Sequence, residues 1–167
     1  FNIATLNEKP QESVKFSFAN LHKYNWDIEH ISPQNPQNIE QVTKELGEGN
    51  VNGIFTDLLE KINNGESYDK ELDKFFAIDD ELMAIGNLTL LIAHDNRGIG
   101  NKFFFRKRQK LQEYYRQGSF IPACSMNVFM KFYSDNPEQM AFWDEKDRES
   151  YKKKIEQTIT KFFGNEQ

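Results

Sequence analysis

The sequence predicts an α+β fold: a small β-sheet embedded in a mostly helical single domain that spans residues 1–167. Two short segments, residues 24–31 and 85–92, have the character of strands, whereas apolar residues recur at helical spacing in most of the remaining chain. The chain is 38% hydrophobic and includes 15 Phe, which is enough apolar material for one core of ordinary size.

The two predicted strands differ in pattern. Residues 24–31 alternate apolar and polar side chains, which is typical of a strand with one buried face. Residues 85–92 are mainly apolar and open with a Gly-Asn turn signal, which suits a buried strand. Pro33 and Pro36 predict a loop over residues 32–38.

Helices account for the other periodic segments. The spacing of apolar residues predicts helices over residues 39–46, 53–63, around 72–76, 102–115 and 144–163. The polar, glycine-rich stretch 94–101 is expected to lead into the helix that starts at Lys102. We therefore expect a core of about residues 24–112, a helical insertion of about 38–80 and a C-terminal helical part of about 120–165.

Composition excludes several classes of protein. Cys124 is the single cysteine, so a disulfide framework and a Cys-rich zinc site are excluded. A cytoplasmic location is the natural expectation, and no run of 18 apolar residues predicts a membrane span. The chain opens with Phe1 and no signal pattern, which we interpret as a C-terminal fragment of a longer protein.

Charge is unevenly distributed along the chain. The net charge is −5, yet residues 96–116 hold seven basic side chains and one acidic side chain, Glu113. Such a segment can attract a phosphate backbone, although a solvated helix face is the simpler alternative. Phe103, Phe104 and Phe105, in its middle, are expected in the core rather than as platforms for stacked bases.

Two segments carry residues suited to catalysis. His30 stands at the expected end of the first strand beside Glu29, and an imidazole with a pKa near 6.5 can take a proton from water at neutral pH. Glu29 and Asn96 offer oxygen ligands of the kind that Mg²⁺ prefers. Asp27 is an alternative ligand, His94 is an alternative base, and Asn96 could instead cap a helix.

These residues together resemble the HNH branch of the His-Me finger nucleases. Glu29-His30-Ile31-Ser32-Pro33 matches the first motif of that family, Asn87-Leu88 the second, and Asn96, nine residues after Asn87, the third. The wider set of motifs resembles the C-terminal nuclease domain of GmrSD-type modification-dependent restriction enzymes and related phage-defence proteins. The long stretch between Pro33 and Asn87 departs from minimal HNH domains, and the cysteines of a zinc ribbon are absent.

The resemblance implies a role for each matched residue within a ββα-metal (His-Me finger) core. His30 would be the general base, Asn87 would brace the loop that orients it, and Glu29 and Asn96 would hold one divalent cation. That cation would be Mg²⁺, with Mn²⁺ able to replace it, and no zinc-ribbon site is expected. The residues expected to contact nucleic acid are Arg97, Asn101, Lys102, Arg106 and Lys107.

The predicted function is that of a divalent-metal-dependent DNA endonuclease or nickase in bacterial restriction or phage defence. The implied partners are DNA and an N-terminal ParB-like nucleotide-binding domain of the full-length protein. Two alternatives stay open: a non-catalytic DNA-binding or regulatory module on a nuclease scaffold, and a nuclease directed at RNA.

Overall fold

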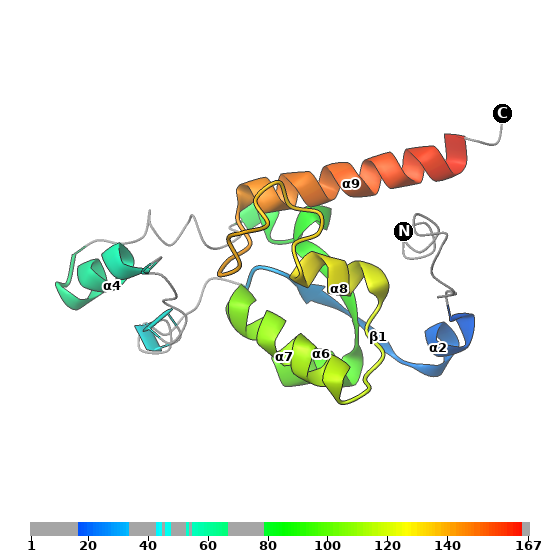
Figure 1. Cartoon of the computed structure of the whole chain (residues 1–167), viewed down its shortest axis with the longest axis horizontal. Coiled ribbons are helices and arrows are strands. Elements are labelled where there is room, and N and C mark those ends of the chain that lie inside the picture. The colour runs from blue at the N-terminus through cyan, green and yellow to red at the C-terminus, as the bar shows by residue number, and fades with distance from the viewer. Residues whose placement is uncertain are drawn as a thin grey trace.

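The computed structural model describes residues 17–33, 43–44, 46–47, 53, 55–66 and 79–164. This part of the chain is mixed, with one two-stranded sheet among helices, so the predicted α+β class is confirmed. In chain order the elements are α2 (Phe18–Lys23), β1 (Trp26–His30), α4 (Thr56–Asn63), the 3-10 turns η2 (Asp79–Glu81) and η3 (Ile85–Asn87), β2 (Leu88–Ile92), α6 (Ala93–Ile99), α7 (Phe104–Arg116), α8 (Ala123–Phe129) and α9 (Glu145–Gly164) (Figure 1).

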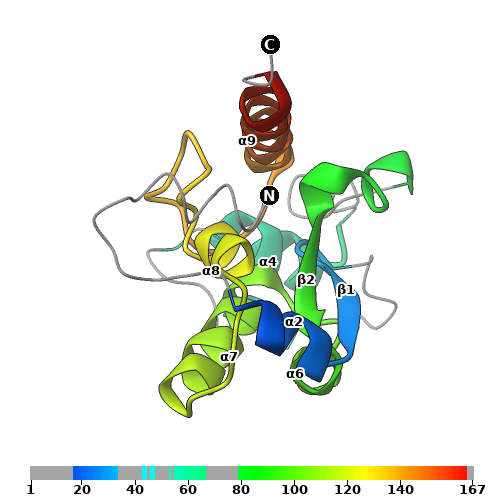
Figure 2. The same cartoon turned by 90° about the vertical axis from the view of Figure 1, so that its right-hand side faces the viewer.

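The sheet is an antiparallel hairpin of β1 and β2, in which Trp26 lies opposite Ile92 and His30 lies opposite Leu88. One face is buried and carries the paired residues Glu29 and Thr89. The other face carries Ile28 and Leu90, which are 59% and 41% exposed. Figure 2 shows α7 and α8 on one side of the two strands and α6 at their lower end.

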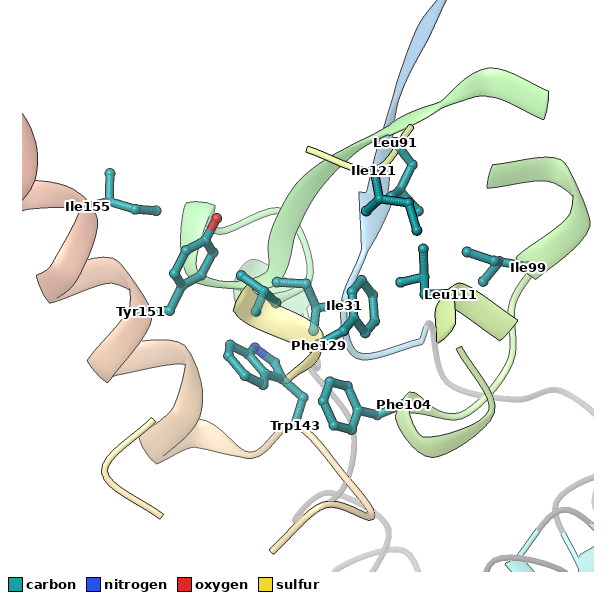
Figure 3. Close-up of a cluster of buried hydrophobic side chains, with 11 residues drawn as sticks. Ile31, Leu91, Ile99, Phe104, Leu111, Ile121, Phe129, Trp143, Tyr151 and Ile155 are labelled. Atoms are coloured by element: carbon teal, nitrogen blue, oxygen red, sulfur yellow. The ribbon is translucent and has the colours of Figure 1, made fainter. Parts of the chain in front are cut away.

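The main core joins the sheet to α6, α7, α8 and α9. Trp143 is fully buried in this core, and the ring of Phe104 stacks against the rings of both Phe129 and Trp143, with centroid separations of 5.6 Å in each pair (Figure 3). The full set of buried members is Ile31, Leu91, Ile99, Phe104, Leu111, Ile121, Val128, Phe129, Trp143, Tyr151 and Ile155. Burial of this apolar surface positions β1 and β2 against the helices.

A second core joins α4 to the beginning of α7. Its buried members are Leu46, Phe55, Leu58, Phe103 and Phe105. The rings of Phe55 and Phe105 lie 6.5 Å apart, centroid to centroid. The expectation that Phe103, Phe104 and Phe105 belong to the core is therefore confirmed, because all three are buried.

The predicted helices agree with the structure over α4, α7 and α9, with small shifts at their ends. The predicted helix around residues 72–76, and most of the one over 39–46, lie outside the described residues. None of the helices in the described ranges has the length and hydrophobicity needed to span a bilayer.

One prediction about the helices was wrong. Residues 94–99 do not lead into the next helix but form most of a separate one, α6, which ends at Gly100 with φ of 62°. A positive φ favours glycine because it has no Cβ. Helices α2 and α8 were not predicted from the sequence, because segments of only six and seven residues are too short to show a helical period.

The close approach of Gly86 to α9 generates a test of the fold. A Cβ at Gly86 would overlap the main-chain carbonyl oxygen of Arg148. We expect Gly86→Ala to lower the free energy of unfolding by about 1–3 kcal/mol, measured by urea titration, because the overlap forces η3 away from α9. Gly164→Ala is the control, since a Cβ there meets no atom within 4 Å. Equal stability of the two variants would contradict this packing.

Candidate active site

His30 is the last residue of β1, and its side chain is partly exposed. Successive residues of a strand point to opposite faces, so His30 is directed away from the face on which Glu29 is buried. Its Nε2 lies 3.3 Å from the Sδ of Met83. A thioether sulfur accepts a hydrogen bond but cannot donate one, so this contact favours the tautomer with hydrogen on Nε2. Nδ1 is then left as the proton acceptor.

The surroundings of His30 favour the neutral imidazole. Partial burial, followed by the positive charge of Lys107, lowers the pKa of His30 below its ordinary value. The form that can accept a proton is therefore favoured at neutral pH. His94, the alternative base, is exposed in the first turn of α6.

Glu29 is buried against α7, where Lys107 is its partner. The Nζ of Lys107 lies 2.6 Å from Oε1 of Glu29, and both side chains are almost entirely buried. The same ammonium donates a hydrogen bond to the main-chain oxygen of His30. Burial raises the pKa of Glu29 and lowers the pKa of Lys107, whereas the attraction between the two charges opposes both shifts. Asp27, the alternative ligand, is partly buried and precedes Glu29 by two residues on the same face of the strand.

Asn87 is completely buried and binds the chain that follows His30. Its Oδ1 accepts a hydrogen bond from the main-chain N–H of Ser32 at 2.8 Å, and its Nδ2 donates to the main-chain oxygen of Leu82 at 3.1 Å. The main-chain N–H of Ile31 donates to the main-chain oxygen of Asn87 at 2.8 Å. These contacts fix the path of residues 31 and 32 directly after the strand, so Asn87 acts on His30 through the backbone.

Asn96 lies in the middle of α6, so the alternative that it caps a helix is excluded; the N-cap of α6 is Ile92. Its Oδ1 is buried and has no hydrogen-bond partner in the described part of the chain. A buried carbonyl oxygen without a partner costs about 1–3 kcal/mol, which a bound cation would offset. No hydrogen bond or ion pair among the described residues joins Asn96 to Glu29 or His30.

The chemistry of these donors fits a hard cation. Within the described ranges, no three or more His, Cys, Asp and Glu side chains gather in a group that could hold a metal ion. One carboxylate from Glu29 and one amide oxygen from Asn96 would leave most coordination positions to water. Mg²⁺ tolerates that arrangement, since it usually keeps several waters and binds through one or two carboxylates.

Of the five residues predicted to contact nucleic acid, four are exposed or partly exposed and one is buried. Arg97 and Asn101 are exposed, and Lys102 and Arg106 are partly exposed, at and around the junction of α6 and α7. Lys107, which the sequence interpretation placed with them, is instead 1% exposed. Its ammonium is engaged inside the protein, so we leave Lys107 out of the surface that could contact nucleic acid.

Sequence reasoning missed the contact of Met83 with His30 and the buried position of Lys107. Nothing in the sequence marks Met83, because it lies 53 residues from His30. A signal for Lys107 was present: it falls between Phe104 and Leu111 at helical spacing, on the stripe of α7 that faces the core.

Comparison with known proteins identifies the family of the chain. A family model described as "GmrSD restriction endonucleases, C-terminal domain" matches residues 2–155. In the same comparisons, no curated protein and no solved structure matches. The family match covers most of the 167 residues. The chain therefore belongs to the family of GmrSD restriction endonuclease C-terminal domains.

Proposed function

We propose that this domain is an HNH-type, divalent-metal-dependent DNA endonuclease or nickase whose ββα-metal core consists of β1, β2 and α6. Membership in a restriction endonuclease family implies nuclease activity. The observation that supports an HNH-type, metal-dependent nuclease is the buried Oδ1 of Asn96, which has no hydrogen-bond partner among the described residues. Asn96 lies on the helix that directly follows the hairpin bearing His30. An oxygen that lacks a protein partner is suited to a cation.

In the proposed reaction, His30 is the general base. Its Nδ1 accepts a proton from a water molecule while the water oxygen attacks the phosphorus of a phosphodiester. The bond from phosphorus to the 3′ oxygen breaks, and that oxygen leaves with the electron pair of the bond. When bound by Glu29 and Asn96, a divalent cation supplies Lewis-acid stabilisation of the negative charge that develops on the phosphate. Asn87 keeps the chain after His30 in place through Ser32.

The exposed and partly exposed polar residues around the junction of α6 and α7 support DNA as the substrate. We propose that Arg97, Asn101, Lys102 and Arg106 contact the phosphate backbone, a kind of contact that fixes register without reading sequence. We further propose that the domain acts in the bacterial cytoplasm in restriction or phage defence, joined in the full-length protein to an N-terminal ParB-like domain. The description of the family as restriction endonucleases supports that setting.

Replacing the proposed base tests the mechanism directly. We expect His30→Ala to slow Mg²⁺-dependent cleavage of plasmid DNA by about 10²–10⁴-fold, because general base catalysis contributes that much. His22→Ala is the matched control, since His22 is exposed in α2. Undiminished cleavage by His30→Ala, with loss in His94→Ala, would move the base to His94. DNA binding without cleavage by the wild-type chain in Mg²⁺ and Mn²⁺ would favour the non-catalytic module.

If Asn96 binds the cation, its replacement should weaken metal-dependent cleavage without destabilising the metal-free protein. Since its Oδ1 has no protein partner, Asn96→Ala should leave the melting temperature of the metal-free protein unchanged or raise it. The Mn²⁺ concentration for half-maximal cleavage should rise by at least about 10–100-fold, since that much is lost even when a residue that only supports a metal ligand is replaced. Asn136→Ala, an exposed control, should change neither quantity. Cleavage that continues at full rate in excess EDTA would overturn the requirement for metal.

Arg97 provides a test of the phosphate contact. Arg97→Gln should weaken binding of duplex DNA at every sequence and lower the slope of log affinity against log salt by about one. Lys152→Gln is the control for loss of one exposed charge, because Lys152 lies on α9. The same salt slope in both variants would remove Arg97 from the interface. Competition with single-stranded RNA identifies the nucleic acid that the surface prefers.

A further inference from the structure

We propose that Lys107 is a positioning residue of this site: its ammonium holds the Glu29 carboxylate and the main-chain carbonyl of His30 in place, and it stays there when a divalent cation binds the second oxygen of Glu29. The inference rests on the proposed function, since it takes Glu29 as a ligand of the cation. It goes beyond that function by assigning the site an internal positive charge from α7.

The geometry around Lys107 supports this role. Its Nζ lies 2.6 Å from Oε1 of Glu29 and also donates a hydrogen bond to the main-chain oxygen of His30. One ammonium therefore holds two consecutive residues at the end of β1. Lys107 is itself fixed, because Phe104 and Leu111 on the same helix are buried in the core on either side of it.

The electrostatic consequence distinguishes positioning from simple structural support. A cation bound to Oε2 of Glu29 would lie close to the ammonium on Oε1, and two positive charges at that separation repel each other. Removing the ammonium should therefore strengthen cation binding. It should also slow the reaction, because Glu29 and His30 lose the group that orients them. Removing a residue that only supports the fold would instead weaken cation binding and slow the reaction together.

The chain offers a matched control in a second buried lysine. The Nζ of Lys131 lies 2.6 Å from Oδ2 of Asp147, and neither side chain is more than 1% exposed. That pair joins the second residue after α8 to the first turn of α9 and takes no part in the proposed site. Lys131→Met therefore removes a buried charge of the same kind without touching Glu29.

The experiment compares Lys107→Met and Lys131→Met in the 167-residue chain. Mn²⁺ binding is measured by the electron paramagnetic resonance signal of free Mn²⁺, and plasmid cleavage is measured at saturating Mn²⁺. For Lys107→Met we expect roughly tenfold tighter Mn²⁺ binding and about 10–100-fold slower cleavage. For Lys131→Met, at a temperature where it is folded, we expect the wild-type value of both.

Two results would overturn the proposal. Unchanged or weaker Mn²⁺ binding in Lys107→Met would show that the ammonium does not share Glu29 with the cation. Tighter binding with wild-type cleavage would show that it orients nothing needed for the reaction. Failure of the proposed function is recognised separately, because a wild-type chain without nuclease activity still reports the effect of Lys107 on Mn²⁺ affinity.

A measurement on the wild-type chain applies if the variant does not fold. Buried ammonium groups are protected from exchange, so Lys107 and Lys131 should give ¹⁵Nζ signals in nuclear magnetic resonance spectra. On addition of Mg²⁺, one signal should shift and persist while the other stays unchanged. Loss of the shifting signal would mean that the cation displaces Lys107. A spectrum in which neither signal shifts would mean that the cation does not bind close to Lys107. Either result contradicts the proposal.

Discussion

The buried ion pair between Glu29 and Lys107 fixes the end of β1 against α7. Each charge is nearly excluded from water, and an isolated buried charge is strongly unfavourable, so each residue requires the other at that position. Because Lys107 also binds the main-chain oxygen of His30, the end of β1 cannot move independently of α7. The apolar core adds to stability around this contact, but it does not by itself select which residue of β1 faces the helix.

A second set of contacts supports the same region from the opposite end of the chain. Trp143, just before α9, donates a hydrogen bond from Nε1 to the main-chain oxygen of Gly86 at 3.0 Å. Arg148 of α9 pairs with Glu81 of η2. Asn87 follows Gly86 and binds Ser32, so α9 supports the chain after His30 through η3. Residues more than a hundred positions after His30 therefore help to hold it.

The ion pair between Glu29 and Lys107 and the contacts of α9 with η2 and η3 hold one side of the candidate site rigidly, while its other side is accessible. Glu29 is buried and paired with Lys107 through Oε1, and Asn87 is buried and hydrogen-bonded at both ends of its amide. His30 is instead partly exposed and contacts the sulfur of exposed Met83. Asn96 presents a buried oxygen that no described residue satisfies. A site of this kind has fixed donors before any ligand arrives, which is the condition for efficient electrostatic stabilisation of a reacting phosphate.

The sequence by itself determined the fold class, both strands, the longer helices, the family, and the candidates His30, Glu29, Asn87 and Asn96. Period and motif spacing are local properties, so they can be read without coordinates. Only the tertiary structure decided that Glu29 binds Lys107, that Asn96 lies in the separate helix α6, and that Met83 contacts His30. Those outcomes depend on which elements pack together. In the sequence Lys107 belongs to a basic segment typical of a surface, and it lies against β1 because Phe104 and Leu111 of the same helix are buried in the core.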